Sequence, residues 1–159
     1  MNQQSLIHDQ MITDMKEFIV RRKTVLRATP AEVWDALTNP EKTKKYFFHC
    51  KVFSDWEVGS TITFVGRIFL IKKIEMKGTI LAIEPGKLLK YSLDNASTKD
   101  GSSSFSVVTD TLTFEDGKTT LVITDDVGEG QGAEERYKKS QKGWTKIIKG
   151  LRKVINKNT

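Results

Sequence analysis

The last third of the chain carries one uninterrupted amphipathic helical pattern, which constrains the fold more than any other feature. From about Ala133 to Asn156, alternating spacings of four and three residues predict a single helix with a mostly apolar stripe. The stripe consists of Tyr137, Gln141, Trp144, Ile148, Leu151 and Ile155. A helix of this length, roughly 35 Å at 1.5 Å per residue, needs a wide surface to cover its apolar side. Only the strands predicted before it can supply that surface.

The middle of the chain has the alternation and turn residues of an antiparallel sheet. Leu89, Tyr91 and Leu93 alternate with polar residues, which is typical of a strand with one buried face. Turn signals stand at Gly59-Ser60, Glu84 to Lys87, Asp100-Gly101 and Asp116-Gly117. Between Gly66 and Met76 the strand boundaries stay open, because Ile68 to Ile71 is apolar throughout and no good turn residue follows.

Two helix starts follow a first strand that we expect from Phe18 to Ala28. Thr29 can cap a helix that opens with Pro30, and Glu32 stands where it completes a capping box. A second start at Asn39-Pro40 opens a short helix to about Tyr46, and the pair should lie across one end of the sheet. Residues 1–17 form an arm or a short helix, and residues 18–159 form a single domain.

The composition of the chain indicates which cellular compartment to expect, and whether its cysteine should form a disulfide. The chain of 159 residues has no long apolar segment and no signal-peptide pattern, so we expect a cytoplasmic protein. Its single cysteine, Cys50, cannot form an internal disulfide, and we expect it to be a buried structural residue.

The net charge of +6 is concentrated on the predicted terminal helix. Lysines recur at helical spacing opposite the apolar stripe, at Lys138, Lys142, Lys146, Lys149, Lys153 and Lys157. They form either a solvated face or an electrostatic surface for nucleic acid, anionic lipid or an acidic partner. Because no aromatic residues interleave with them to stack on bases, we expect no nucleic acid partner.

At this point the sequence resembles a known family. It resembles the START-like helix-grip superfamily, also called SRPBCC, and within it the bacterial proteins similar to the heat-shock-protein-90 ATPase activator. The resemblance rests on Ala28 to Pro40 (ATPAEVWDALTNP), Lys77 to Pro85 (KGTILAIEP), Thr111 to Phe114, Thr119 to Thr124, and Gly143-Trp144.

This resemblance implies an α+β helix-grip fold, in which a curved, mostly antiparallel six-stranded sheet wraps around a long C-terminal helix. Two short helices follow the first strand, and a cavity lies between sheet and helix. In some relatives the cavity takes an apolar ligand, in others it does chemistry, and in the cochaperone relatives the domain contacts a protein. Tyr46-Phe47-Phe48 stands where family members often have Trp-Phe-Gly.

Familiar catalytic and metal motifs are missing from the sequence. His49 and Cys50 are adjacent, and on a strand their side chains would point to opposite faces, which argues against a catalytic dyad. Neither HExxH nor GxxxxGK[ST] is present, and we expect no metal and no cofactor. The glycine-rich loop from Gly128 to Gly132 has acidic surroundings, which favour a strand-to-helix hinge over a phosphate site.

Asp110 is the most informative single residue. Strand alternation carries it to the same face as Val108, Leu112 and Phe114, which is otherwise apolar. Either a bulge or turn exposes it, or Arg22, Arg67 or a hydroxyl pairs with it. The functional alternative is a polar anchor for a ligand, or a general acid or base.

We therefore expect noncatalytic binding of a small apolar or amphipathic molecule between sheet and helix. The residues expected at this ligand site are Phe47, Trp56, Phe64, Tyr91, Asp110, Phe114, Tyr137 and Trp144. Two alternatives stay open. One is a protein-interaction module that contacts a chaperone, and the other is a cyclase-like or hydrolase-like enzyme.

Overall fold

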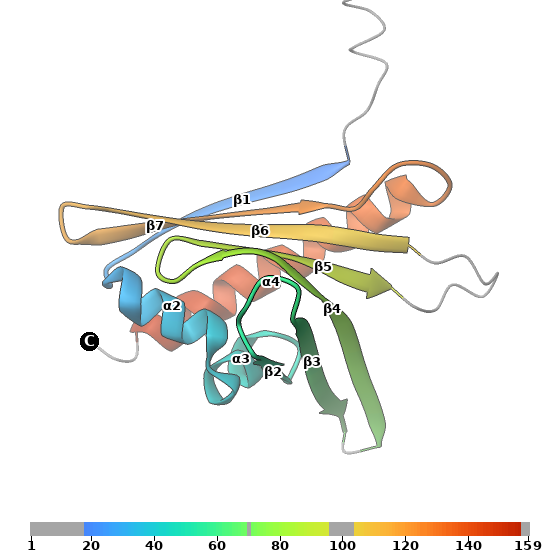
Figure 1. Ribbon diagram of the computed structural model, residues 1–159, viewed down its shortest axis with the longest axis horizontal. Helices are drawn as coiled ribbons and strands as arrows, with labels where there is room; N and C mark the ends of the chain where they lie inside the picture. The colour runs from blue at the N-terminus through green and yellow to red at the C-terminus, as the bar shows by residue number, and fades with distance from the viewer. Residues whose placement is uncertain (1–17, 70, 96–103, 157–159) are drawn as a thin grey trace, which may run out of the picture.

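The computed structural model describes residues 18–69, 71–95 and 104–156, and it has one antiparallel sheet packed on one long helix (Figure 1). The sheet has seven strands in the order β1-β7-β6-β5-β4-β3-β2. The strands are β1 (Ile19–Leu26), β2 (Cys50–Ser54), β3 (Thr61–Ile68), β4 (Lys72–Glu84), β5 (Leu88–Asn95), β6 (Ser104–Glu115) and β7 (Lys118–Asp126). The helices are α2 (Pro30–Thr38), α3 (Pro40–Tyr46) and α4 (Ala133–Asn156). The arm expected at residues 1–17 lies outside the described residues.

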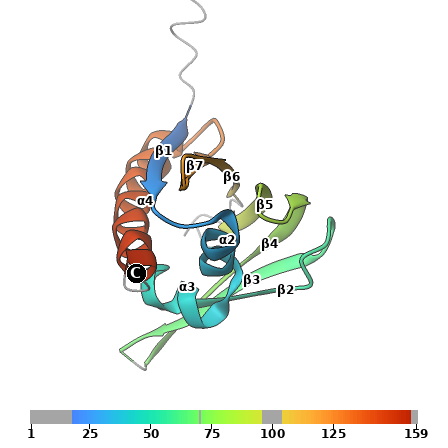
Figure 2. The ribbon, with the colours of Figure 1, turned by 90° about the vertical axis from the view of Figure 1, so that its left-hand side faces the viewer.

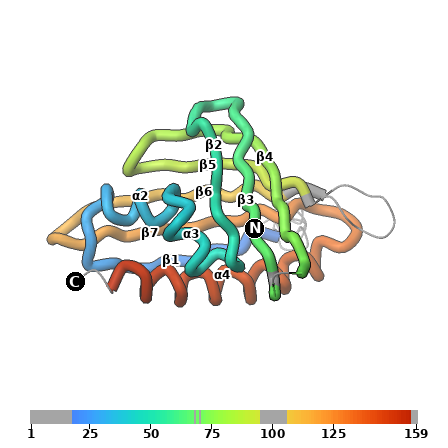
Figure 3. Tube along the Cα trace, turned by 90° about the horizontal axis from the view of Figure 1, so that it is seen from below, coloured from blue at the N-terminus to red at the C-terminus, as the bar shows by residue number. Residues whose placement is uncertain are grey.

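The sheet is strongly curved, and α4 lies along its concave side. The end-on view in Figure 2 shows the sheet running around from β1 to β2, with α4 across the open side and α2 and α3 at one end. Seen from below in Figure 3, α4 runs the length of the molecule, and the far ends of β3 and β4 overlap it in this view. This is the helix-grip arrangement that the resemblance implied.

The expected six strands are wrong by one, because the stretch left open between Gly66 and Met76 is a hairpin. β3 and β4 pair up to Ile68 and Lys72, so the chain reverses around Phe69 and Ile71. These two side chains are 89% and 88% exposed, and Phe69 has a positive φ of 55°. The turn was missed because apolar residues occupy positions where turns usually carry glycine, asparagine or proline.

Both predicted helix starts are present. The Thr29 hydroxyl accepts a hydrogen bond from the Glu32 backbone N–H at 3.2 Å, and the Asn39 side chain accepts one from Glu41 at 3.0 Å. Each cap satisfies a backbone donor that the first helical turn leaves free. These two caps fix where α2 and α3 begin.

α4 has the predicted bounds and buries one side against the sheet. Trp144, Ile147, Leu151 and Ile155 are buried, whereas Ile148, expected on the stripe, is half-buried. At the crossing with α3, Gly150 lies against Tyr46, where an added methyl carbon would be 2.8 Å from the Tyr46 Cβ. The lysines at 138, 142, 146, 149 and 153 are exposed, as a solvated face requires.

Candidate ligand site between the sheet and the long helix

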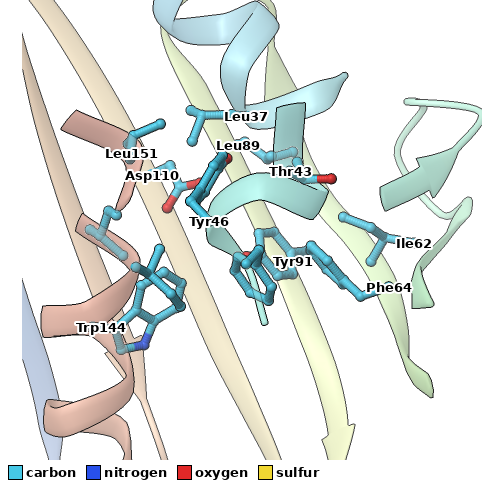
Figure 4. A pocket seen from close by; sticks show the side chains of 13 residues that line it. Leu37, Thr43, Tyr46, Ile62, Phe64, Leu89, Tyr91, Asp110, Trp144 and Leu151 are labelled. Carbon is cyan, nitrogen blue, oxygen red and sulfur yellow. The ribbon is translucent and has the colours of Figure 1, made fainter. Parts of the chain in front are cut away.

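A small cavity lies where the concave face of the sheet meets α3 and α4 (Figure 4). Its volume is about 20 Å³, which is room for about one water molecule. It is lined by Leu37, Thr43, Tyr46, Phe47, Ile62, Phe64, Leu89, Tyr91, Asp110, Ile123, Trp144, Ile147 and Leu151. The wall is therefore apolar and aromatic, with one carboxylate.

Five of the eight residues predicted for the ligand site line this cavity: Phe47, Phe64, Tyr91, Asp110 and Trp144. Phe47 is central among them. Its ring stacks on Phe64 at 4.5 Å between centroids and meets Trp144 edge-on at 5.9 Å. Phe64 in turn lies 5.8 Å from Tyr91. The aromatic wall expected from the sequence is thus one continuous cluster, in which Phe47 contacts rings on both sides.

The other three predicted residues lie elsewhere. Phe114 is 53% exposed, so its predicted inward position is wrong; it stands near the β6–β7 turn, which extends past α2 (Figure 1). Trp56 borders a groove on the outer surface. Tyr137 is half-buried at the start of α4, where its ring packs edge-on against Phe18 at 6.0 Å. Strand parity fixes a face, but it does not show where along the strand the covering helices stop.

Asp110 faces inward, as strand parity predicted, and is only 4% exposed. Its Oδ1 atom has no hydrogen-bond partner in the protein. Neither arginine considered as a partner reaches it, because Arg22 donates to the backbone carbonyls of Arg21 and Gln141, and Arg67 is exposed on β3. The expectation that a bulge exposes Asp110 or that one of these arginines neutralises it is therefore wrong.

The surroundings of Asp110 favour its protonated form. Burial, followed by the nearby Asp125 carboxylate, raises the pKa of Asp110 to about 7. Burial, and then the charge of Asp110, also raises the pKa values of the Tyr46 and Tyr91 hydroxyls. A carboxyl group that titrates near neutral pH can anchor a ligand or transfer a proton.

Asp125 is a second buried carboxylate, which the sequence reading missed. Its Oδ2 accepts hydrogen bonds from Ser140 Oγ at 2.6 Å and from Trp144 Nε1 at 2.9 Å. Its Oδ1 has no partner in the protein. The sequence pattern does place Asp125 inside, because Asp125 continues the alternation that points Leu121 and Ile123 inward on β7.

The segment after α3 forms the end wall of the cavity. The Tyr46 hydroxyl donates to the Ala36 carbonyl at 2.6 Å. Phe48 and His49 have positive φ values of 49° and 60°, a conformation that non-glycine residues rarely adopt. Cys50 is fully buried, as predicted, and burial raises the pKa of its thiol, while His49 is exposed. These two residues therefore do not form a nucleophilic dyad.

The glycine-rich loop before α4 contributes none of its described residues to the cavity wall. It is held by one side chain, because Arg136 donates to the backbone carbonyls of Val127, Glu129 and Gln131. These contacts attach the loop to the start of α4. The proposed hinge remains a prediction.

Within the part of the chain that the structure describes, no three His, Cys, Asp or Glu side chains gather in a group that could hold a metal ion. The same residues include no helix that is long and apolar enough to cross a membrane.

Comparison with known proteins agrees with this fold. The family model described as Activator of Hsp90 ATPase homolog 1-like protein matches residues 27–156. A solution structure from Cytophaga hutchinsonii is 33% identical, with a TM-score of 0.69, and the match covers 91% of this chain and 98% of that chain.

Two more distant structures share the fold. A crystal structure from Mesorhizobium loti is 23% identical, with a TM-score of 0.74 and coverage of 89% and 98%. The Aha1 dimer from Colwellia psychrerythraea is 15% identical, with a TM-score of 0.65 and coverage of 86% and 95%. Comparison with curated proteins gives no match.

Proposed function

The chain belongs to the family of Activator of Hsp90 ATPase homolog 1-like proteins, and from this we propose that it binds a small, mainly apolar ligand between its sheet and α4. The observation that carries the proposal is the Asp110 carboxylate, which has an unpartnered oxygen and lines an otherwise apolar, aromatic cavity. Buried polar groups without partners are rare in folded proteins, because each costs about 1–3 kcal/mol. Concave apolar sites with a few polar groups are typical of ligand pockets.

The cavity must enlarge to accept such a ligand. A volume of about 20 Å³ is far below the roughly 300 Å³ of the smallest common ligand pockets. Phe47 is the side chain whose movement would add most space, because its ring stands between Phe64 and Trp144. It also leads into the positive-φ residues Phe48 and His49. We propose that this end wall moves when a ligand enters.

Native mass spectrometry of the purified protein tests for a retained ligand, and titration with the neutral fluorescent probe N-phenyl-1-naphthylamine tests for interior binding. Shortening Phe47 enlarges the cavity, so Phe47→Leu and Phe47→Ala should both bind the probe more tightly than the unaltered protein does. Phe47→Ala leaves the larger cavity and should bind the probe most tightly. The expected gain for the alanine variant is about tenfold.

Phe53→Ala is the matched control, because Phe53 is 50% exposed on β2 and does not line the cavity. It should bind the probe as the unaltered protein does. Circular dichroism establishes that each variant folds. The proposal fails if the protein retains no small molecule and if neither Phe47 variant binds the probe better than the Phe53 control.

A second candidate function is contact with a chaperone of the Hsp90 type. It draws on the family description and on the apolar tip of the β3–β4 hairpin, where Phe69 and Ile71 are almost fully exposed. Exposed apolar side chains that stand together often mark protein contacts.

A further inference from the structure

We infer that the ligand of this cavity carries a protonated amine, and that its N–H groups bind the Asp110 carboxylate. The inference rests on the proposed function and names the chemical class of the ligand. The observations that support it are the positions of the charged groups and of the hydrogen-bonding groups around Asp110.

Among the described residues, the interior contains two buried carboxylates, Asp110 and Asp125. Asp110 on β6 pairs with Ile123 on β7, and Val108 pairs with Asp125, so the two aspartates lie two positions apart on neighbouring strands and on the same face. No salt bridge within residues 18–69, 71–95 and 104–156 involves either of them. Each has one oxygen without a protein partner. When Asp110 is ionised, its buried negative charge has no counter-charge among the described residues, which favours a positive ligand.

Asp110, rather than Asp125, is positioned to meet the ligand. Asp125 already accepts two hydrogen bonds and does not line the cavity. Asp110 lines the cavity, and Figure 4 shows its carboxylate between Tyr46 and Leu151. Tyr46 cannot supply the missing donor, because its hydroxyl proton is already given to the Ala36 carbonyl. None of the residues that the structure describes donates to Asp110 Oδ1, so a molecule in the cavity can supply this donor.

The cavity wall distinguishes between classes of ligand. None of the described residues that line it is basic, so nothing there would hold an anion next to two carboxylates. A neutral alcohol or a water molecule could donate one hydrogen bond, but it would leave the charge uncompensated. An ammonium group supplies up to three donors and a positive charge. The rings of Phe47 and Trp144 add faces that attract cations.

Size separates a primary amine from a bulkier cation. The space beside Asp110 holds about one water molecule, and an ammonium group has about that size. A trimethylammonium group is larger and has no N–H donor. The apolar part of the ligand would occupy the space that becomes free when the Phe47 side chain moves.

Binding of an amine should also move a proton. Burial and Asp125 raise the pKa of Asp110 to about 7, and a neighbouring ammonium group would lower it. The groups that face Asp110 are Tyr46 from α3, Tyr91 from β5 and Asp125 from β7. The tyrosines are neutral near pH 7, since even their ordinary pKa of about 10 lies well above it and burial raises it further. Amine affinity should therefore increase as pH rises from 6 to 8.

Four probes of equal chain length test the inference by isothermal titration calorimetry: octylamine, octanol, octanoate and trimethyloctylammonium. At pH 8, octylamine should bind about tenfold more tightly than octanol, and octanoate and trimethyloctylammonium should bind more weakly than octylamine. Asp110→Asn should remove the preference for octylamine and leave octanol affinity within about threefold. Asp94→Asn, which changes an exposed aspartate on β5, is the matched control and should keep the preference.

The outcomes separate this inference from the function on which it rests. If octanol binds as tightly as octylamine, or if Asp110→Asn keeps the amine preference, the ligand class is wrong while interior binding stands. If none of the four probes, and no neutral naphthyl probe, binds the protein, interior binding itself is wrong. An octylamine affinity that does not change between pH 6 and pH 8 also contradicts pairing with Asp110.

Discussion

At the scale of single residues, Asp110 should make the stability of the protein depend on pH. Its pKa rises from 3.8 to about 7 on folding, so the folded protein binds a proton that the unfolded chain releases between about pH 4 and pH 7. Stability therefore falls as pH rises through this interval. Asp110→Asn removes the ionisable group and should stabilise the protein at pH 8 by roughly 2–4 kcal/mol.

Urea unfolding at pH 5 and pH 8 measures this effect. At pH 5 Asp110 is protonated in the folded protein but already largely ionised in the unfolded chain, so the variant should be stabilised by less than half as much as at pH 8. Asp94→Asn, on the exposed side of β5, should show no such difference between the two pH values. An equal effect of Asp110→Asn at both pH values would mean that the folded state does not raise the pKa of this carboxyl.

The residue scale also shows what period-two alternation can and cannot predict. It correctly placed Asp110 inside and would have placed Asp125 there too, because both continue apolar positions of one strand face. It wrongly placed Phe114 inside, because alternation does not show that β6 extends beyond the helices that cover the sheet. The partners of a buried carboxylate come from other elements, such as Ser140 and Trp144 on α4. Their distances depend on packing that the sequence pattern does not contain.

At the scale of elements, two glycines on α4 should respond oppositely to the same substitution. Gly150→Ala puts a methyl group 2.8 Å from the Tyr46 Cβ and 3.3 Å from its Cα, where the backbone must move. It should destabilise the protein by about 1–3 kcal/mol. Gly143→Ala meets only the Phe48 ring at 3.4 Å, and it should stabilise the helix by up to about 1 kcal/mol.

Thermal or urea unfolding of the two variants gives the comparison. Since both changes have the same helix propensity, the difference between them reports the close contact of α3 with α4. If Gly150→Ala is as stabilising as Gly143→Ala, then α3 does not lie against the long helix at this point.

The sequence predicted the long helix and both capped helices well, because each has a periodic pattern or a capping residue. The β3–β4 hairpin was not predicted, since its turn around Phe69 and Ile71 lacks the residues that usually mark a turn. The sequence did not predict the size of the cavity either. A stripe of aromatic residues looks the same whether the rings fill the interior or surround a space.

At the scale of the whole molecule, the exposed hairpin tip gives the chaperone candidate its test. Because Phe69 and Ile71 are 89% and 88% exposed, replacing both with serine should change the free energy of unfolding by less than about 0.5 kcal/mol. The same double variant should bind a purified Hsp90-type chaperone at least about tenfold more weakly in surface plasmon resonance, if the tip is the contact.

Phe114→Ser is the control, because it also removes an exposed aromatic ring from a hairpin, at the β6–β7 turn. Its chaperone affinity should match that of the unaltered protein. Equal losses in both variants, or no loss in either, would leave the β3–β4 tip without a specific role in such a contact.

The position of α4 after all the strands has a consequence for how the protein is made. The strands leave the ribosome first, and the 24 residues of α4 follow over about 1 to 5 seconds at ordinary rates of synthesis. During this time the nascent sheet has no helix over its hollow side, and the Asp110 carboxyl is open to water.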